Sequence, residues 1–374
     1  MGIEEYSFEN AVSYHSGQFP PTRLGYEQMF ASITAAASSI AKYDALLSTL
    51  PNSEILLAPL RAREAVISSR IEGTVATLDE VLKYEADDSE SEAVYRQEVI
   101  EVVSYRRAMN HAQRLMADGL PLSGRLLRAA HSRLLFLGRG ADKNPGNFKT
   151  EQNYIVDRVK KEVLFVPVTM RDFDQAFSIF ENYMNDDTVV PLLSVSLAHA
   201  EFESLHPFKD GNGRLGRMLI TLMLWNRGII RAPHFYISSS FERSRDDYIE
   251  KLREVSSYGN WTEWCIFFFK AIIDQAEESC KSIERIRNLY DEMKENFRVI
   301  SASQWSVNAL DFIFGKPIFR NSEFTESSGI PRQTAHRITT ALANAGLLTI
   351  VQSGSGRRST VYGFYPLINE IAND

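Results

Sequence analysis

The sequence predicts a mainly α-helical protein with two β-hairpins and more than one domain. Apolar residues recur at helical spacing over most of the 374 residues. β-rich runs occur in two pairs, 153–156 with 163–166 and 347–351 with 360–364. The length is enough for two or three domains, each with its own hydrophobic core.

Composition excludes several classes of protein. Apolar and charged fractions of 44% and 24% argue against wholesale disorder. A net charge of −7 argues against nucleic-acid binding by bulk electrostatics, although a local basic patch stays open. Cys265 and Cys280 lack metal-ligand spacing, so we expect free thiols in a reducing cytoplasm. The first residues lack a basic flank and an apolar core, so we expect no signal peptide. The most apolar stretch, 265–269, is too short to span a bilayer, so no membrane association is expected.

Helices are expected in the N-terminal region at 24–50, 59–71, 93–118 and 123–136. The second of these is predicted to begin at Pro59 and to end at Gly73, a residue suited to a C-terminal cap. Residues 77–80 resemble a capping box that opens a further short helix. The acidic stretch 84–92 is expected to be an exposed loop.

In the central region, Gly, Pro and Asn predict a loop over 138–152, directly before the first hairpin. Helical pattern covers 170–226 and breaks near Asp186 and again over 207–213. Two more helices are expected at 246–255 and 261–294.

From about residue 301 the composition indicates a separate small domain. Helices predicted at 306–314, 321–328 and 331–345 precede the second hairpin, which is the order of a winged helix-turn-helix. The predicted domains are an N-terminal helical region, a central core and this C-terminal domain, at 1–110, 111–295 and 300–374.

The segment 206–217 has the features of an anion site. Pro207 disfavours helical geometry in His206, so the preceding helix must end there. A second apolar helix follows, which places Gly211 and Gly213 at a helix N-terminus. The glycines let several backbone N–H groups converge, and the helix dipole favours phosphate at that point.

The side chains of this segment suit a polyphosphate. Asp210 is a hard oxygen ligand for a Mg²⁺ ion shared with phosphates. Arg214 and Arg217 lie three residues apart on one helical face and can pair with phosphate oxygens. His206 can take a proton near neutral pH. Together they predict phosphoryl or nucleotidyl transfer; the alternative is a helix–loop–helix in which His206 and Asp210 only cap helices.

The same segment resembles the signature of the Fic family, His-x-Phe-x-Asp/Glu-Gly-Asn-Gly-Arg-x-x-Arg, and matches every fixed position. The resemblance implies transfer of AMP from ATP to a Tyr, Thr or Ser hydroxyl of a protein, with release of pyrophosphate. It implies that His206 is the base, that Asp210 holds Mg²⁺ and that Tyr248 lies on the adenine side. The remaining ATP-binding residues that it implies are Gly211, Asn212, Gly213, Arg214, Leu215, Gly216 and Arg217.

A second motif lies upstream. Ser68 and Glu72 are four residues apart on one helical face, and Glu72 lies at a helix C-terminus, where the dipole disfavours negative charge. Glu72 therefore needs a cationic partner or a functional role, unless it is only a solvent-exposed glutamate. The run resembles the inhibitory motif of Fic proteins, Ser/Thr-x-x-x-Glu-Gly/Asn, with Gly73 at its last position. That resemblance implies an inhibitory helix at about 59–73 and a pairing of Glu72 with Arg217 that withholds the arginine from the γ-phosphate.

The first hairpin, within 145–167, resembles the Fic flap, which holds a target segment by strand addition. An ordinary surface hairpin is the alternative. The resemblance thus implies a Fic-type helical core with a β-hairpin flap, a target protein held near 153–166, and the appended winged helix. Members of the family often dimerise, so a homodimer is one expected assembly, although no residue here identifies it.

Other functions stay open at this stage. The C-terminal domain would bind DNA through basic residues on its third helix and wing, or it would mediate protein contacts, since Glu323 and Glu326 lie nearby. The residues that would face DNA are Arg332, Gln333, His336, Arg337, Arg357 and Arg358. A DNA-binding regulator with a nucleotide-sensing core, removal of AMP, and transfer of phosphocholine or phosphate are the alternatives. The intact His206 favours an enzyme, because sensing needs no base.

Overall fold

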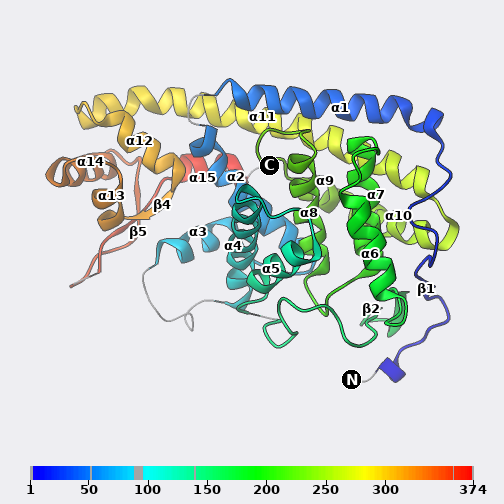
Figure 1. The fold of residues 1–374 in the computed structure, drawn as a ribbon. Coiled ribbons are helices and arrows are strands. Elements are labelled where there is room, and N and C mark those ends of the chain that lie inside the picture. The colour runs from blue at the N-terminus through cyan, green and yellow to red at the C-terminus, as the bar shows by residue number, and fades with distance from the viewer. Residues whose placement is uncertain (1–2, 51–52, 88–95, 139, 357, 373–374) are drawn as a thin grey trace. The chain divides into compact units, whose positions relative to one another are not determined.

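The computed structural model describes residues 3–50, 53–87, 96–138, 140–356 and 358–372, and helices dominate them (Figure 1), as predicted. The chain forms two compact units from discontinuous segments. The first comprises Met1–Asp44, Ser68–Thr74 and Ser104–Ala276, and the second Ala45–Ile67, Val75–Val103 and Glu277–Asp374. These units differ from the three regions proposed from the sequence, whose boundaries stay a prediction.

In the first unit, three helices pack side by side (Figure 1): α6 (Phe173–Met184), α7 (Pro191–Leu205) and α8 (Asn212–Asn226). α5 (Gly124–Leu134) packs on α8, and α10 (Arg245–Tyr258) on α7. α7 is buried on all sides, including its polar residues Ser194 and Glu201. The break between α7 and α8 falls where Pro207 and Gly211 predicted it, so the site loop joins the two most enclosed helices.

A small sheet contains the predicted first hairpin, β2 (Ile155–Asp157) and β3 (Glu162–Val166), paired antiparallel. β1 (Val12–Ser13) pairs in parallel with β3, which gives the strand order β1-β3-β2. This pairing was not predicted, because two residues far from β3 in the sequence leave no local pattern. β1 covers one edge of the hairpin, and the described residues place no strand on the outer edge of β2.

The N-terminal helices are α1 (Tyr26–Ser48), α2 (Ser53–Ile71), α3 (Leu78–Ala86) and α4 (Gln97–Ala117). The predicted start of the inhibitory helix at Pro59 is wrong, because α2 begins at Ser53 and contains Pro59. A proline inside a helix costs about 3 kcal/mol. The helix continues through it because residues before Pro59, such as Leu56 and Leu57, are buried.

The capping box before α3 is confirmed: Thr77 Oγ1 accepts from the Glu80 amide, and the Glu80 carboxylate accepts from the Thr77 amide. The predicted loop at 84–92 is wrong at its start, since 84–86 belong to α3. Residues 88–92, and the start of the helix predicted at 93–118, lie outside the described residues.

α9 (Ser238–Arg243) and α11 (Trp261–Ser301) complete the central helices. Beyond α11 the second unit continues with α12 (Ser306–Gly315), β4 (Ile318–Arg320), α13 (Asn321–Ser327), α14 (Arg332–Asn344), β5 (Thr349–Gln352), β6 (Val361–Gly363) and α15 (Tyr365–Ala372). Its sheet has the order β4-β6-β5. The three helices and the hairpin follow the predicted order, and β4 and α15 were not predicted. The assignment as a winged helix stays a prediction.

Both cysteines are free thiols, as expected. Within the described residues, the helices are too short or too polar to cross a membrane.

Candidate functional site

The loop between α7 and α8, which carries the predicted site residues, begins at a residue held in an unusual conformation. α7 ends at Leu205, and His206 caps it with a left-handed backbone, φ +47°. This conformation costs a non-glycine residue about 1–2 kcal/mol, so surrounding contacts must hold it. Gly211 takes the second left-handed position, φ +77°, directly before α8. His206 therefore lies at the bend that connects two buried helices.

Donors from outside the loop bind its backbone carbonyls. Lys149 Nζ donates to the Leu205 carbonyl at 3.0 Å, and the Lys149 amide to the Pro207 carbonyl at 2.8 Å. Asn153 Nδ2 donates to the carbonyls of His206 and Phe208 at 2.8 and 3.0 Å. Both donors precede β2, so the base of the hairpin and the loop form one hydrogen-bonded structure.

His131 on α5 holds the other end of the loop. Its Nε2 lies 3.0 Å from the Asp210 carbonyl, which can only accept, so Nε2 carries the proton. Its Nδ1 accepts from the Gly146 amide at 2.9 Å. Burial lowers the pKa of His131 to about 4, in agreement with this neutral tautomer. The ring also stacks on buried Phe208, with centroids 3.8 Å apart, so His131 is a structural residue of the loop.

The Asn212 side chain closes the loop on itself. Its Oδ1 accepts from the Phe208 amide at 2.9 Å, and its Nδ2 donates to the Phe208 carbonyl at 2.8 Å. The side chain is therefore occupied, and Asn212 offers an anion only its backbone N–H.

His206 has the neutral tautomer that its predicted role as a base requires. Its Nδ1 lies 3.3 Å from the Glu203 carbonyl, which can only accept, so Nδ1 carries the proton and Nε2 keeps a free electron pair. Burial and the nearby Lys149 ammonium lower the pKa of His206 to about 4. The imidazole is therefore neutral at pH 7 and able to accept a proton.

The N-terminus of α8 is where the sequence predicts an anion site. The first bond of the helix runs from the Leu215 amide to the Gly211 carbonyl at 3.0 Å. The amides of residues 212–214 precede it and have no carbonyl one turn back, as at every helix start. Arg217, one turn further along, is 2% exposed. Backbone N–H groups and a guanidinium thus lie along one side of this turn.

Arg217 is held by the predicted inhibitory residues. Its Nε donates to Ser68 Oγ at 2.9 Å, and its Nη2 donates to the Ser68 carbonyl at 2.7 Å and to Glu72 Oε1 at 2.9 Å. Burial acts to raise the pKa of Glu72, but the Arg217 charge outweighs it and holds the pKa below its ordinary value. Gly73 follows with φ +87°, a backbone angle that favours glycine. The structure therefore brings the inhibitory motif onto Arg217.

Glu72 also covers the first turn of α8. A Cβ atom built on Gly213 would collide with Glu72 Oε1. The carboxylate thus lies directly over the helix start where an anion would bind.

Tyr248 is buried near Arg217. The tyrosine is 3% exposed, and its hydroxyl lies 2.9 Å from His199 Nε2. His199 Nδ1 in turn donates to the Gly216 carbonyl at 3.2 Å. The adenine-side role predicted for Tyr248 stays a prediction; in the structure its hydroxyl contacts His199 and its ring stacks on Phe241.

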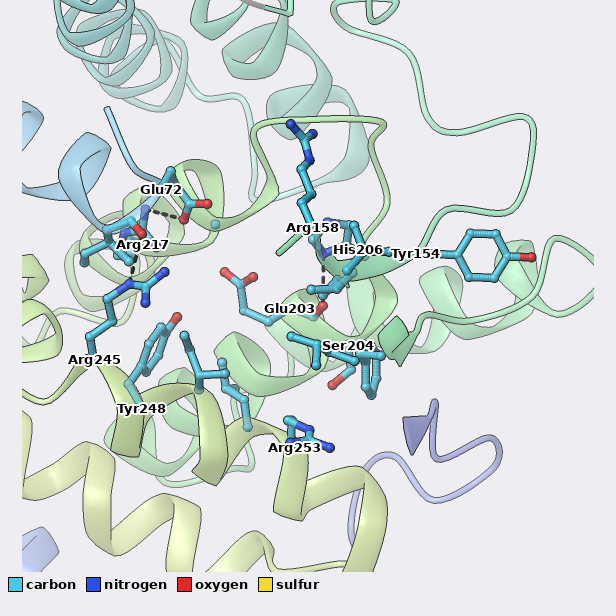
Figure 2. Close-up of a pocket in the computed structure, with 18 residues that line it drawn as sticks. Glu72, Tyr154, Arg158, Glu203, Ser204, His206, Arg217, Arg245, Tyr248 and Arg253 are labelled. Carbon is cyan, nitrogen blue, oxygen red and sulfur yellow. Dashed lines mark hydrogen bonds and ion pairs between the residues drawn. The ribbon is translucent and has the colours of Figure 1, made fainter. Parts of the chain in front are cut away.

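A cavity of about 440 Å³ joins these groups (Figure 2). Among the predicted residues it is lined by His206, Gly213, Arg217, Tyr248 and Glu72. Six residues of the hairpin and its base also line the cavity: Tyr154, Ile155, Val156, Arg158, Leu164 and Phe165. The other predicted residues lie outside its lining: Ser68, Gly73, Asp210, Gly211, Asn212, Arg214, Leu215 and Gly216.

Asp210 fits a magnesium ion shared with a substrate. Its side chain is 34% exposed, its Oδ1 accepts from the Gly211 amide at 2.6 Å, and Arg214 lies 3.8 Å away. The described residues contain no cluster of three His, Cys, Asp or Glu side chains that could cage a metal. One accessible carboxylate beside an anion site suits Mg²⁺, which commonly binds through one or two carboxylates, water and phosphates.

Sequence reasoning missed several residues of the site. They are Lys149, Asn153 and His131, which hold the loop, and Glu203, Arg158 and Arg245, which line the cavity. Glu203 was the easiest to find, because it precedes His206 by three residues, about one helical turn. The others are distant in sequence and carry no motif.

Comparison with known proteins agrees with this architecture. The family model described as "Fic/DOC family N-terminal" matches residues 30–114, and that described as "Fic/DOC family" matches 121–224. A Fic family protein from Desulfovibrio desulfuricans has the same fold, with a TM-score of 0.58 and 17% identity over 92% of this chain and 98% of that one. The chain belongs to the Fic family.

Curated relatives cover less of the chain. A protein adenylyltransferase Fic from Nematostella vectensis is 25% identical over 49% of this chain and 34% of its own length. A probable protein adenylyltransferase from Aquifex aeolicus is 34% identical over 20% of this chain and 21% of its own length. The chain thus spans well under two thirds of the length of these relatives.

Proposed function

We propose that this Fic protein is an auto-inhibited adenylyltransferase that transfers AMP from ATP to a Tyr, Thr or Ser hydroxyl of a protein. One observation carries the proposal: the His206 base, the Gly213 backbone and Arg217 line the same 440 Å³ cavity. A base and an anion site that share one cavity suit a substrate that contains both a reacting phosphorus and a polyphosphate tail. The curated relatives named protein adenylyltransferases support it.

The chain's own groups account for the reaction as follows. His206 Nε2 takes the proton of the target hydroxyl as its oxygen attacks the α-phosphorus. The bond from that phosphorus to the bridging oxygen of the β-phosphate breaks, and pyrophosphate leaves. Arg217, Arg214 and the amides of 212–214 bind the departing phosphates. Asp210 would hold Mg²⁺, which neutralises phosphate charge when it is bound.

Auto-inhibition follows from competition for Arg217. The Glu72 carboxylate takes the guanidinium and lies over Gly213. A phosphate at that helix start must displace it. In the inhibited state His206 therefore stays in place, but Arg217 is not available to bind the phosphates of the nucleotide.

The target segment would bind the outer edge of β2. The inner strand β3 is already paired on both sides, with β2 and β1. Strand addition to β2 needs only backbone hydrogen bonds, which leaves side-chain identity open and permits self-modification.

Intact-mass measurement after incubation with ATP and Mg²⁺ tests the proposal. Glu72→Gly should gain the mass of AMP, wild type should gain little, and the double variant with His206→Ala should gain none. Absence of AMP from the Glu72→Gly protein and from added cell-extract proteins would contradict the proposal.

DNA binding is a second candidate, favoured by the exposed face of α14. Arg332, Gln333 and His336 are exposed there, while Ala335 and Ile338 are buried. Arg337 is exposed but donates to the Ser301 carbonyl at 2.7 Å, so Arg332→Ala is the cleaner variant. A mobility shift at low salt that Arg332→Ala weakens would support this function, and no shift by the wild type would exclude it.

A further inference from the structure

Glu203 occupies a place that the proposed mechanism does not use. It lies on the last turn of α7, and its backbone carbonyl accepts a hydrogen bond from His206 Nδ1–H. Its side chain lines the cavity. Figure 2 shows the carboxyl group in the middle of the cavity, with Arg217 and Arg245 on one side and His206 and Arg158 on the other. A nucleotide that reaches from His206 to Arg217 must pass this group.

The carboxyl oxygen Oε1 of Glu203 is buried and has no hydrogen-bond partner among the described residues. It lies on the backbone of α8, where a Cβ atom on Gly216 would collide with it. An unsatisfied buried oxygen is costly, and an ionised one more so. The position therefore favours the uncharged acid over the carboxylate.

The charged neighbours of Glu203 come from every surrounding element. Glu72 faces it from the residues that directly follow α2, and Arg217 faces it from α8. Tyr248 and Arg245 face it from α10, and Arg158 from the hairpin, beside His206 of its own segment. Arg217 is already paired with Glu72, so its charge is compensated in part.

Burial raises the pKa of Glu203 to about 8, Arg217 opposes the rise, and Glu72 adds to it. Glu203 is thus mainly protonated at neutral pH. A protonated carboxyl can donate a hydrogen bond, whereas a carboxylate only accepts and repels phosphate.

We propose that Glu203 is a nucleotide-positioning residue that acts as an uncharged acid and donates a hydrogen bond to a phosphate or ribose oxygen of the bound nucleotide. This inference rests on the nucleotide site of the proposed function, but it does not require AMP transfer. It assigns to Glu203 a role opposite to that of Glu72, although both carboxyl groups lie over glycines of the same helix.

The proposal predicts the pH dependence of ATP affinity. Above the pKa of Glu203 the ionised group repels the polyphosphate and no longer donates, so the dissociation constant for ATP should rise. If bound ATP raises the pKa of Glu203 by about one unit, the dissociation constant for ATP changes about tenfold across the titration. We therefore expect the dissociation constant to rise about tenfold between about pH 7 and pH 9.5.

Calorimetric titration of ATP with Mg²⁺ into the Glu72→Gly protein measures this directly. Because Glu72 raises the pKa of Glu203 and pairs with Arg217, its removal should make the rise begin at a lower pH than in a protein that keeps Glu72. Adding Glu203→Gln, which keeps a donor and cannot ionise, should preserve affinity at pH 7 and flatten the pH profile. Glu203→Ala, which removes the donor, should weaken binding about tenfold at pH 7. Glu27→Gln makes the same chemical change on the exposed face of α1 and should leave the profile unchanged.

The outcomes separate the two proposals. If Glu203→Gln weakens binding at pH 7 as much as Glu203→Ala, or leaves the alkaline rise intact, the role assigned to Glu203 is wrong. ATP binding with the expected profiles but without AMP transfer would contradict only the proposed function. Failure of ATP to bind the Glu72→Gly protein at any pH would overturn both.

Discussion

The two sides of the first turn of α8 are held in different ways. On the loop side, carbonyls from Leu205 to Asp210 are bound by donors from the base of the hairpin and from α5. On the inhibitory side, Glu72 and Ser68 are held against α8 through one guanidinium, that of Arg217. On the loop side, donors from three residues, Lys149, Asn153 and His131, share the contacts, so the position does not depend on one group. On the inhibitory side, a substrate that binds the one guanidinium replaces the contacts that hold Glu72 and Ser68.

The largest effect should come from removing the base that the loop positions. In the Glu72→Gly background, His206→Ala should lower AMP incorporation by about 10²- to 10⁴-fold, the usual contribution of a general base. Mass spectrometry of the labelled protein measures the rate. A fall of less than about tenfold would show that the loop positions something other than the base.

A second variant removes hydrogen bonds on the loop side and leaves His206 unchanged. Asn153→Asp keeps the shape of the side chain but removes both donors to the His206 and Phe208 carbonyls. Because small displacements of a reacting group can cost 10²-fold, we expect the turnover rate to fall by about 10- to 100-fold with ATP affinity retained.

Asn147→Asp is the matched control for that variant. Asn147 is exposed and bonds to Asn144 and Arg128, not to the loop, so activity should persist. Equal rates for the two variants, from pyrophosphate release, would mean that the loop holds its position without Asn153.

The inhibitory side should respond in the opposite direction. Glu72→Gln removes the charge and keeps the size, which weakens a charged hydrogen bond worth about 1.5–3 kcal/mol. We therefore expect AMP incorporation to rise by about tenfold to a hundredfold. An unchanged rate would show that Glu72 does not compete with the nucleotide for Arg217.

The smallest effect belongs to Ser68→Ala. This change removes the acceptor of Arg217 Nε, while the Ser68 carbonyl and Glu72 still hold Nη2. A single hydrogen bond of about 1 kcal/mol predicts a rise in rate of about fivefold. A rise as large as that of Glu72→Gln would mean that Ser68, not the carboxylate, sets the inhibition.

Much of the fold was readable from local pattern. The break between α7 and α8 followed from Pro207 and two glycines, and the Thr77 capping box from four adjacent residues. The helix start predicted at Pro59 was wrong, because burial of the neighbouring leucines stabilises the helix by more than the proline destabilises it. β1 and β4 were missed because strands of two or three residues gain their identity from a partner far along the chain.

The sequence by itself determined which chemical groups meet at the start of α8, because those groups are consecutive and their geometry follows from one helix terminus. It also indicated that Ser68 and Glu72 share a face, since helical spacing is local. Only the tertiary structure decided that Glu72 lies over Gly213, that Glu203 lies over Gly216, and that the base of the hairpin binds the loop carbonyls. These contacts join segments distant in sequence, so their distances, and the burial that sets the charge of Glu203, arise only when the helices pack.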